Sequence, residues 1–241
     1  MRLLQVDRLS KHFGGVTAVN EVIFEIRQGE IVGLIGPNGA GKTTVFNLIS
    51  GLLHPSQGRI YFGGKDITGL RPHQKSLLGI GRTFQIVRPF DGMTVLENVM
   101  VPTLVRHRNP QKAREMARGV LRDVGLDAFC EANPQNLPYA YRKRLEVARA
   151  LATEPKLLLL DEVLAGLNSR EVSEALPLIH RIRERGVTIF MIEHIMTALM
   201  SVSDRVLVLE QGELIAEGTP KEVTENPRVI KAYLGENVSI G

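Results

Sequence analysis

The chain has 241 residues, 44% of them hydrophobic, and a mean hydropathy of zero, so one large α/β domain with a substantial buried core is possible. Its formal charge of +4 is modest, and its Lys and Arg residues are interspersed with Asp and Glu, which gives no argument for a nucleic-acid partner. The single cysteine, Cys130, excludes an internal disulfide framework and fits a reducing compartment. The N-terminal MRLLQVDRLSKHF has no apolar core of signal-peptide length, and no run of about 18 apolar residues predicts a membrane span.

Strand patterns dominate the first third of the chain. The stretch EIVGLIG at 30–36 is a short apolar run that ends in glycine, as is typical of a buried parallel strand. A helix is expected after it, from about Lys42 to Ser50, with Gly51 as its stop. Partial alternation or apolar character predicts further strands at LLQVDRL, VIFEIR, GRIYFGG (58–64) and IGRTFQ (80–85).

The character of the chain changes from Pro89 to about Leu151, where helical patterns are broken by Pro and Asn, and we interpret this part as an inserted helical subdomain. Strand patterns return in KLLLLDE and VTIFMIE, with a helix through the 170s and early 180s between them. RVLVLEQGELIAEG predicts a hairpin that turns at Gln211-Gly212. Strands that alternate with helices indicate βαβ units and a mainly parallel sheet. The expected divisions are a core of 1–88 and 152–218, the helical subdomain 89–151, and a C-terminal helical tail 219–241.

The segment Gly36-Pro37-Asn38-Gly39-Ala40-Gly41-Lys42-Thr43 matches G-x-x-x-x-G-K-[ST], the phosphate-binding P-loop, between a predicted buried strand and a predicted helix. Glycines allow successive backbone N–H groups to point inward as an anion nest, and the helix start adds the positive end of its dipole. We expect Lys42 to reach the β- and γ-phosphates of a nucleotide, Thr43 to ligate Mg²⁺, and Thr44 to add a hydroxyl contact to phosphate. A glycine-rich turn without a ligand is the alternative, but such a turn requires no lysine followed by a hydroxyl.

The acids Asp161 and Glu162 follow four leucines at 157–160. The leucines predict a buried strand, and in open α/β sheets ligands bind at the carboxyl ends of the strands. We expect Asp161 to hold the Mg²⁺ hydration shell and Glu162 to orient or deprotonate an attacking water. The alternative is a pair of acids that end a strand in solvent. Adjacent acids, and the lack of an Asn-Lys-x-Asp motif in the sequence, separate the chain from small GTPases.

Three isolated residues are further candidates. Gln85, at the end of the IGRTFQ strand, can contact Mg²⁺ or water through its amide oxygen; a surface glutamine is the alternative. His194, after the VTIFMIE strand, can reach a γ-phosphate, although a lone histidine is more often a satisfied surface residue. Phe13, before Gly14-Gly15, either stacks on adenine or belongs to the core.

The order of these motifs, with the segment LPYAYRKRLEVARA at 137–150 between Gln85 and Asp161, resembles the ATP-binding subunit of ABC proteins over nearly the whole chain. The resemblance implies a P-loop NTPase (RecA-like) α/β fold: a mainly parallel core with an N-terminal antiparallel β subdomain and an inserted helical subdomain. It also implies ATP hydrolysis with Mg²⁺. By itself the 137–150 segment is a helix with a solvated basic face. In the family it is the signature, usually Leu-Ser-Gly-Gly-Gln, and the helix N-terminus faces the γ-phosphate of ATP held by the other subunit of a head-to-tail dimer.

The strings GIGRTFQIVRPFDGMTVLENV, AGLN at 165–168, IEH at 192–194 and the tail AYLGE look like those of the branched-chain amino acid importers, and IEH and RTFQ favour the larger of their two ATP subunits. The resemblance implies a second ATP-binding subunit, two transmembrane permease subunits, an extracytoplasmic substrate-binding protein that acts indirectly, and no nucleic acid. It implies a peripheral location on the cytoplasmic face of the inner (plasma) membrane. Related systems for urea, short amides or lipopolysaccharide export are alternatives, as are a soluble ABC ATPase outside transport and a non-hydrolysing ATP-binding regulator.

The signature positions depart from the family pattern. They are occupied by Pro138, Tyr139, Ala140 and Tyr141, so the hydroxyl, the second glycine and the glutamine are replaced. Ala140 restricts a backbone that must approach phosphate closely, and Tyr141 adds bulk. Val163 stands where the family usually has proline after the catalytic glutamate. We hypothesise that the P-loop and Glu162 of this subunit are competent, whereas the ATP site completed by its signature is weaker.

Overall fold

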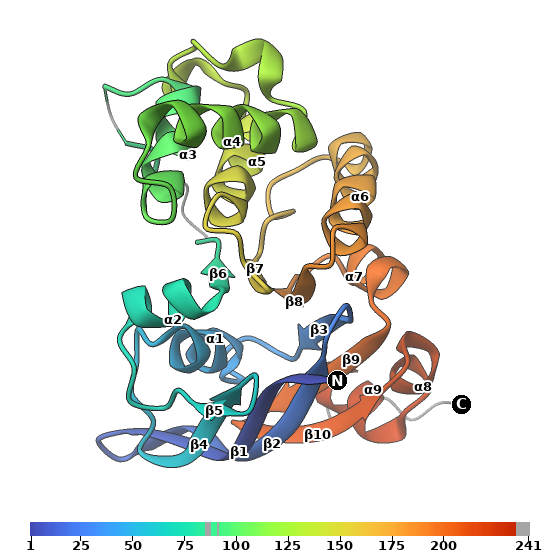
Figure 1. Ribbon diagram of the computed structural model, residues 1–241. Coiled ribbons are helices and arrows are strands. Elements are labelled where there is room, and N and C mark those ends of the chain that lie inside the picture. The colour runs from blue at the N-terminus through green and yellow to red at the C-terminus, as the bar shows by residue number, and fades with distance from the viewer. Residues whose placement is uncertain (85–87, 91, 235–241) are drawn as a thin grey trace.

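The computed structural model describes residues 1–84, 88–90 and 92–234, and within them the strands form two sheets (Figure 1). The antiparallel sheet lies at one end of the molecule and helices α3, α4 and α5 lie together at the other; the second sheet extends from β6, near these helices, to β10, beside β2. This arrangement confirms the predicted fold class: a mainly parallel core, an N-terminal antiparallel sheet and an inserted group of helices.

The larger sheet has the strand order β10-β9-β3-β8-β7-β6. Its neighbouring strands are parallel except for β10, which is antiparallel to β9. The turn between these two strands is at Gln211-Gly212, as predicted, and both residues have positive φ, as a type I′ hairpin turn requires. The strand bounds are β3 Ile31–Ile35, β6 Ile80–Arg82, β7 Leu157–Asp161, β8 Thr188–Ile192, β9 Arg205–Glu210 and β10 Glu213–Gly218.

The smaller sheet is antiparallel, in the order β2-β1-β4-β5, and it contains the strands predicted near the N-terminus. Its bounds are β1 Arg2–Phe13, β2 Val16–Arg27, β4 Gln57–Phe62 and β5 Lys65–Asp66. The strand predicted at 58–64 ends earlier, at Phe62, because Gly63 and Gly64 have positive φ and form the turn into β5.

Helix α1 follows β3 and spans Lys42–Ser50, with Gly51 in the left-handed conformation that closes its last turn, as the sequence predicts. In the helical group, the structure has α3 Val95–Leu104, α4 Pro110–Asp123 and α5 Tyr139–Leu151, with short 3₁₀ turns at Asp127–Phe129 and Pro134–Asn136. The later helices are α6 Ser169–Glu184, α7 Met196–Val202, α8 Pro220–Thr224 and α9 Pro227–Leu234.

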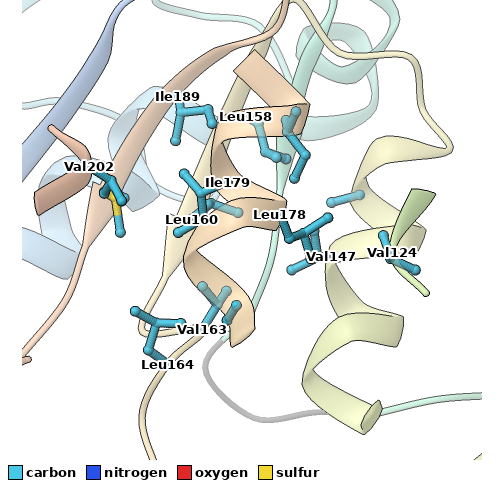
Figure 2. Packing of buried hydrophobic residues seen from close by; sticks show 14 of the residues in the cluster. Val124, Val147, Leu158, Leu160, Val163, Leu164, Leu178, Ile179, Ile189 and Val202 are labelled. Carbon is cyan, nitrogen blue, oxygen red and sulfur yellow. The ribbon is translucent and has the colours of Figure 1, made fainter. Parts of the chain in front are cut away.

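Alternate residues of the parallel strands enter two different hydrophobic clusters. Leu158 and Leu160 of β7 pack with α5, α6 and α7, whereas Leu157 and Leu159 pack toward α1 and the antiparallel sheet. Because both faces of the strand are covered, its sequence is a continuous apolar run and not an alternating one. Figure 2 shows the first cluster, in which Val163, the residue that replaces the usual proline, is buried beside α6.

One expectation from the sequence needs correction, and one helix was not predicted. The predicted IGRTFQ strand ends at Arg82. After it, the amide of Asp161 in β7 donates to the side-chain hydroxyl of Thr83 at 3.0 Å and not to a main-chain carbonyl of β6, so the regular β6–β7 pairing stops there. Helix α2, Pro72–Leu78, was not expected, although proline in its first turn and Gly79 after its end are ordinary helix boundary signals. Among the described residues, no helix is long and apolar enough to cross a bilayer.

Candidate nucleotide-binding site

The P-loop connects β3 to α1, and its backbone depends on glycine. Gly39 and Gly41 have φ of 81° and 100°, in the left-handed region that other residues rarely adopt. A Cβ on Gly41 would lie 2.3 Å from the carbonyl oxygen of Ala18. The carbonyl of Ala40 accepts from the amide of Gly212 at 3.0 Å, so the β9–β10 turn supports the loop. The fold therefore requires glycine here for backbone reasons, in addition to any contact with phosphate.

The side chain of Lys42 is buried against its own loop. Its Nζ donates to the carbonyl oxygens of Gly36 and Pro37 at 2.6 and 3.0 Å. Burial lowers the pKa of Lys42, and the nearby charge of Glu162 opposes that shift. The P-loop cation and the predicted catalytic carboxylate, distant in sequence, therefore lie close enough to interact electrostatically. Asn38 is exposed and Thr44 half-buried on either side of this lysine.

Thr43 and Asp161, both predicted to bind Mg²⁺, line one pocket of about 460 Å³. Their hydroxyl and carboxylate oxygens are ligands that Mg²⁺ prefers, so this donor set fits the ion. No group of three or more His, Cys, Asp or Glu able to hold a metal by themselves occurs in the described residues. Gln85, predicted both as a catalytic residue and as a third ligand, lies outside the described residues.

Arg82, which the sequence analysis did not single out, is the principal partner of Asp161. Its Nη2 donates to the Asp161 carboxylate at 2.9 Å, and its Nη1 donates to the side-chain oxygens of Asn47 and Ser50 at 2.7 and 2.8 Å. Burial raises the pKa of Asp161, whereas Arg82 counteracts that shift. Arg82 was missed because its role depends on which strand lies beside β7. The IGRTFQ string, which was noted as a predicted strand and as a family resemblance, contained the residue.

Glu162 and His194, predicted as catalytic from separate strands, are adjacent in space. His194 Nε2 lies 2.7 Å from Glu162 Oε1, with the imidazole about half exposed and the carboxylate almost buried. Strands β7 and β8 are parallel neighbours, so their carboxyl ends bring the two residues to the same edge of the sheet. Glu162 has φ of 51°, an uncommon conformation for a residue with a side chain, and such strain is often found at functional sites.

The signature segment begins helix α5 at the protein surface. Pro138 and Tyr139 are exposed, and Pro138 is the residue at which the chain enters the helix. Tyr141 points away from this surface: its ring packs against Phe129 within the helical group, with ring centroids 5.0 Å apart. The bulk expected from Tyr141 is therefore directed into the chain's own helices, whereas Ala140 lies in the first turn of α5.

The basic residues that follow the signature do not form a solvated face. Lys143 is buried, and its Nζ donates to the main-chain carbonyl of Glu162 at 3.0 Å. Arg144 lies 3.7 Å from the carboxylate of Glu174 on α6. The simplest interpretation of the segment from its sequence, a basic face in water, is wrong for these two side chains, because the helix packs against the loop that carries Glu162.

Phe13 is at the end of β1, next to the Gly14-Gly15 turn, and its side chain is 46% exposed. The core alternative for this residue is therefore excluded. Its only described ring contact is with the Lys11 ammonium, 5.1 Å from the ring centroid. An exposed ring on a hairpin is compatible with stacking on a base, but the role in adenine binding remains a prediction.

Comparison with known families and proteins agrees with these features. Residues 19–165 match the family model described as "ABC transporter", and residues 213–239 match that of the "Branched-chain amino acid ATP-binding cassette transporter". The high-affinity branched-chain amino acid transport ATP-binding protein BraF of Pseudomonas aeruginosa is 42% identical over 97% of this chain and 98% of its own. LivG of Salmonella typhimurium, of the same description, is 43% identical with the same coverage.

Solved structures show the same fold. The ATP-binding cassette MJ1267 of an ABC transporter superposes with a TM-score of 0.89 at 31% identity, covering 98% of this chain and 100% of that one. A dimeric cassette, MJ0796, described as a post-hydrolysis state with ADP and phosphate, has a TM-score of 0.82 at 26% identity, covering 90% of this chain and 99% of its own.

Proposed function

The chain belongs to the ABC transporter family, and from that premise we propose that it binds and hydrolyses ATP to power a membrane importer for branched-chain or other hydrophobic amino acids. The observation that carries the substrate class is the 42–43% identity to BraF and LivG over nearly the full length of both chains. A lipopolysaccharide export relative, LptB of Acidithiobacillus ferridurans, is 34% identical over 99% of this chain, so export is the second candidate.

Nucleotide binding is assigned to the P-loop and its surroundings. The backbone amides of the loop and the ammonium of Lys42 would hold the terminal phosphates, with Phe13 against the base. Thr43 and Asp161 would hold Mg²⁺, which when bound would neutralise charge on the phosphate oxygens. Arg82 donates to the Asp161 carboxylate and so orients it in the pocket that it shares with Thr43.

Hydrolysis is assigned to the adjacent pair at the ends of β7 and β8. The Glu162 carboxylate would orient the attacking water and accept a proton from it. The His194 imidazole, hydrogen-bonded to that carboxylate at 2.7 Å, fixes its direction and, at the exposed edge, is able to reach a phosphate oxygen. Positioning of the water and stabilisation of charge on the phosphate would accompany this proton transfer.

Docking of membrane subunits is assigned to a groove of about 290 Å³ between α2, β6, α3 and α5. Large apolar side chains are exposed there in a group, which is uncommon on a surface that meets only water; they are Leu52, Phe84, Phe90 and Val105. Arg149 of α5 stacks on Phe90, 4.6 Å from its ring centroid, so the groove is mechanically tied to the signature helix. Cytoplasmic helices of two permease subunits would fit such a surface at the inner face of the membrane.

A second ATP-binding subunit would complete each nucleotide site. The exposed start of α5, at Pro138 and Tyr139, presents a helix N-terminus for the γ-phosphate of ATP bound to the partner subunit. The related cassette MJ0796 is described as dimeric. A substrate-binding protein on the outer side would contact the permeases and not this chain.

The function is tested by reconstituting the chain with its membrane subunits and binding protein in liposomes loaded with ATP. We expect uptake of labelled leucine that depends on Mg²⁺ and disappears when Lys42 is replaced by alanine. Uptake of urea or a short amide in place of leucine would retain an importer but reject the substrate class. Release of lipopolysaccharide from the liposomes would favour the second candidate. Mg-ATP hydrolysis that no membrane subunit stimulates would reject the transport function.

A further inference from the structure

Glu162 sits in a main-chain conformation that must be held in place by its neighbours. Its φ of 51° is in the left-handed region, where a Cβ is crowded by the following carbonyl. The residue before it ends strand β7, and Val163 and Leu164 after it are buried beside α6 (Figure 2). A short segment with the reactive carboxylate is therefore fixed at both ends and strained in the middle, so its geometry depends on the hydrogen bonds along it.

Hydrogen bonds to helix α5 and to the end of strand β8 hold this segment. The amide of Glu162 donates to the carbonyl of Ile192 in β8 at 2.9 Å. The carbonyl of Glu162 accepts from Lys143 Nζ of α5 at 3.0 Å. The amide of Leu164 donates to the carboxylate of Glu193, just after β8, at 2.7 Å. Two of the three partners are side chains, and neither is one of the predicted catalytic residues.

Both side chains are buried, with Lys143 3% and Glu193 1% exposed. Burial of an ammonium and a carboxylate is costly unless each is paired or hydrogen-bonded, so a fold retains them where their contacts are needed. The positive charge of Lys143 lowers the pKa of Glu193, against the larger effect of burial, so the two groups also interact with each other. The second carboxylate oxygen of Glu193 has no hydrogen-bond partner among the described residues.

We propose that Lys143 and Glu193 are positioning residues that hold the main chain on both sides of the Glu162 carboxylate, and that Lys143 transmits the position of helix α5 to that carboxylate within the same subunit. The inference rests on the proposed role of Glu162 in ATP hydrolysis. Lys143 is in the second turn of the helix that starts at the signature. A movement of this helix therefore displaces a donor bonded directly to the catalytic residue.

A second contact supports this path. The ring of Tyr139, in the first turn of α5, lies against Gly166 in the loop after Glu162: a Cβ on Gly166 would be 3.0 Å from the ring. Lys143 Nζ is 5.6 Å from the centroid of the same ring. The start of α5 and the loop 163–168 therefore move together unless these contacts break.

The test uses matched variants of the purified chain, with steady-state Mg-ATPase turnover (kcat), KM and ATP affinity measured for each. E193A removes the acceptor for the Leu164 amide, whereas E193Q keeps a carbonyl oxygen there. K143M removes the donor, K143R keeps one, and K112M is the control, because Lys112 is an exposed lysine on α4. We expect E193A and K143M to lower kcat about tenfold or more while KM and ATP affinity change by less than about twofold. E193Q, K143R and K112M should stay within about threefold of the parent kcat.

Equal kcat in E193A and E193Q, or a kcat in K143M within about twofold of the parent, would overturn the positioning role. If thermal melting shows that K143M does not fold, the comparison of E193A with E193Q alone tests the positioning role. Failure of the proposed function is recognised separately, because then the parent chain itself has no Mg-dependent turnover or the E162Q variant retains it. With membrane subunits present, their stimulation of turnover should fall in K143M and persist in E193Q. An undiminished stimulation in K143M would reject the transmission through α5.

Discussion

The guanidinium of Arg82 lies 2.9 Å from the carboxylate of Asp161, and both side chains are almost fully buried. The same guanidinium donates to Asn47 and Ser50 of α1, so one arginine connects strands β6 and β7 to the helix that follows the P-loop. The orientation of the predicted Mg²⁺ ligand therefore depends on a residue 79 positions away in the sequence.

Replacing Arg82 by methionine should destabilise the chain strongly. Removing one partner of a buried ion pair leaves an uncompensated charge, so we expect the R82M variant to lose about 3 kcal/mol in the free energy of unfolding. Urea unfolding followed by circular dichroism measures this loss. The double variant R82M/D161N should recover part of it, because an amide carries no charge. A change below about 0.5 kcal/mol in R82M would mean that the pair is not buried in solution.

The Glu162→Gln variant should separate binding from hydrolysis. Glutamine retains the size and one hydrogen-bond acceptor but cannot take a proton from water, so we expect turnover to fall by about 10²–10⁴-fold while ATP affinity is kept. The variant should also remain in a closed dimer with ATP, detectable by size-exclusion chromatography. E184Q is the matched control, since Glu184 is exposed at the end of α6. Parental turnover in E162Q would remove Glu162 from the mechanism.

Glu193 predicts a pH dependence of stability. Burial raises the pKa of Glu193 from 4.5 to about 7, and the charge of Glu162 adds to this rise. The backbone of Leu164, the charge of Lys143 and the backbone of His194 act in the opposite direction. Because the folded pKa exceeds the unfolded one, the folded chain binds more protons in this window. Its free energy of unfolding therefore falls as pH rises from about 4.5 to 7.

The E193Q variant lacks this titration. We expect it to be more stable than the parent at about pH 8, by up to about 3 kcal/mol, and the difference to shrink to near zero below about pH 4.5. Urea unfolding of both chains across this range measures it. A difference that does not change with pH would show that Glu193 ionises normally in the folded state.

The signature departures predict unequal ATP sites in a heterodimer. Ala140 would restrict the backbone that we propose faces the partner's ATP, whereas the chain retains the P-loop motif and Glu162. In a reconstituted transporter, inactivating Glu162 here should lower transport and ATPase turnover much more than inactivating the corresponding glutamate of the partner subunit. Transport assays on the two single-site variants compare these effects. Equal losses would refute the hypothesis of a weaker site.

Features that depend on residues close together in the sequence were predictable from the sequence. Glycine positions indicate the end of α1 and the Gln211-Gly212 turn. The P-loop is recognised from its glycines between a predicted strand and a predicted helix. Asp161 and His194 were identified because each follows an apolar run long enough to form a buried strand. Because the carboxyl ends of parallel strands lie at the same edge of a sheet, residues that follow two such strands are expected at that edge.

The tertiary structure alone decided which side chains meet. Lys143, Glu193 and Arg82 contact residues 19, 29 and 79 positions away, through α5, β8 and β6 packing around β7, and no local pattern encodes such pairings. The direction of Tyr141, into the helices and against Phe129, likewise depends on where α5 lies. Helical and strand periods determine the buried face of an element, but the partner on that face is set by long-range packing, for which one sequence contains no short-range signal.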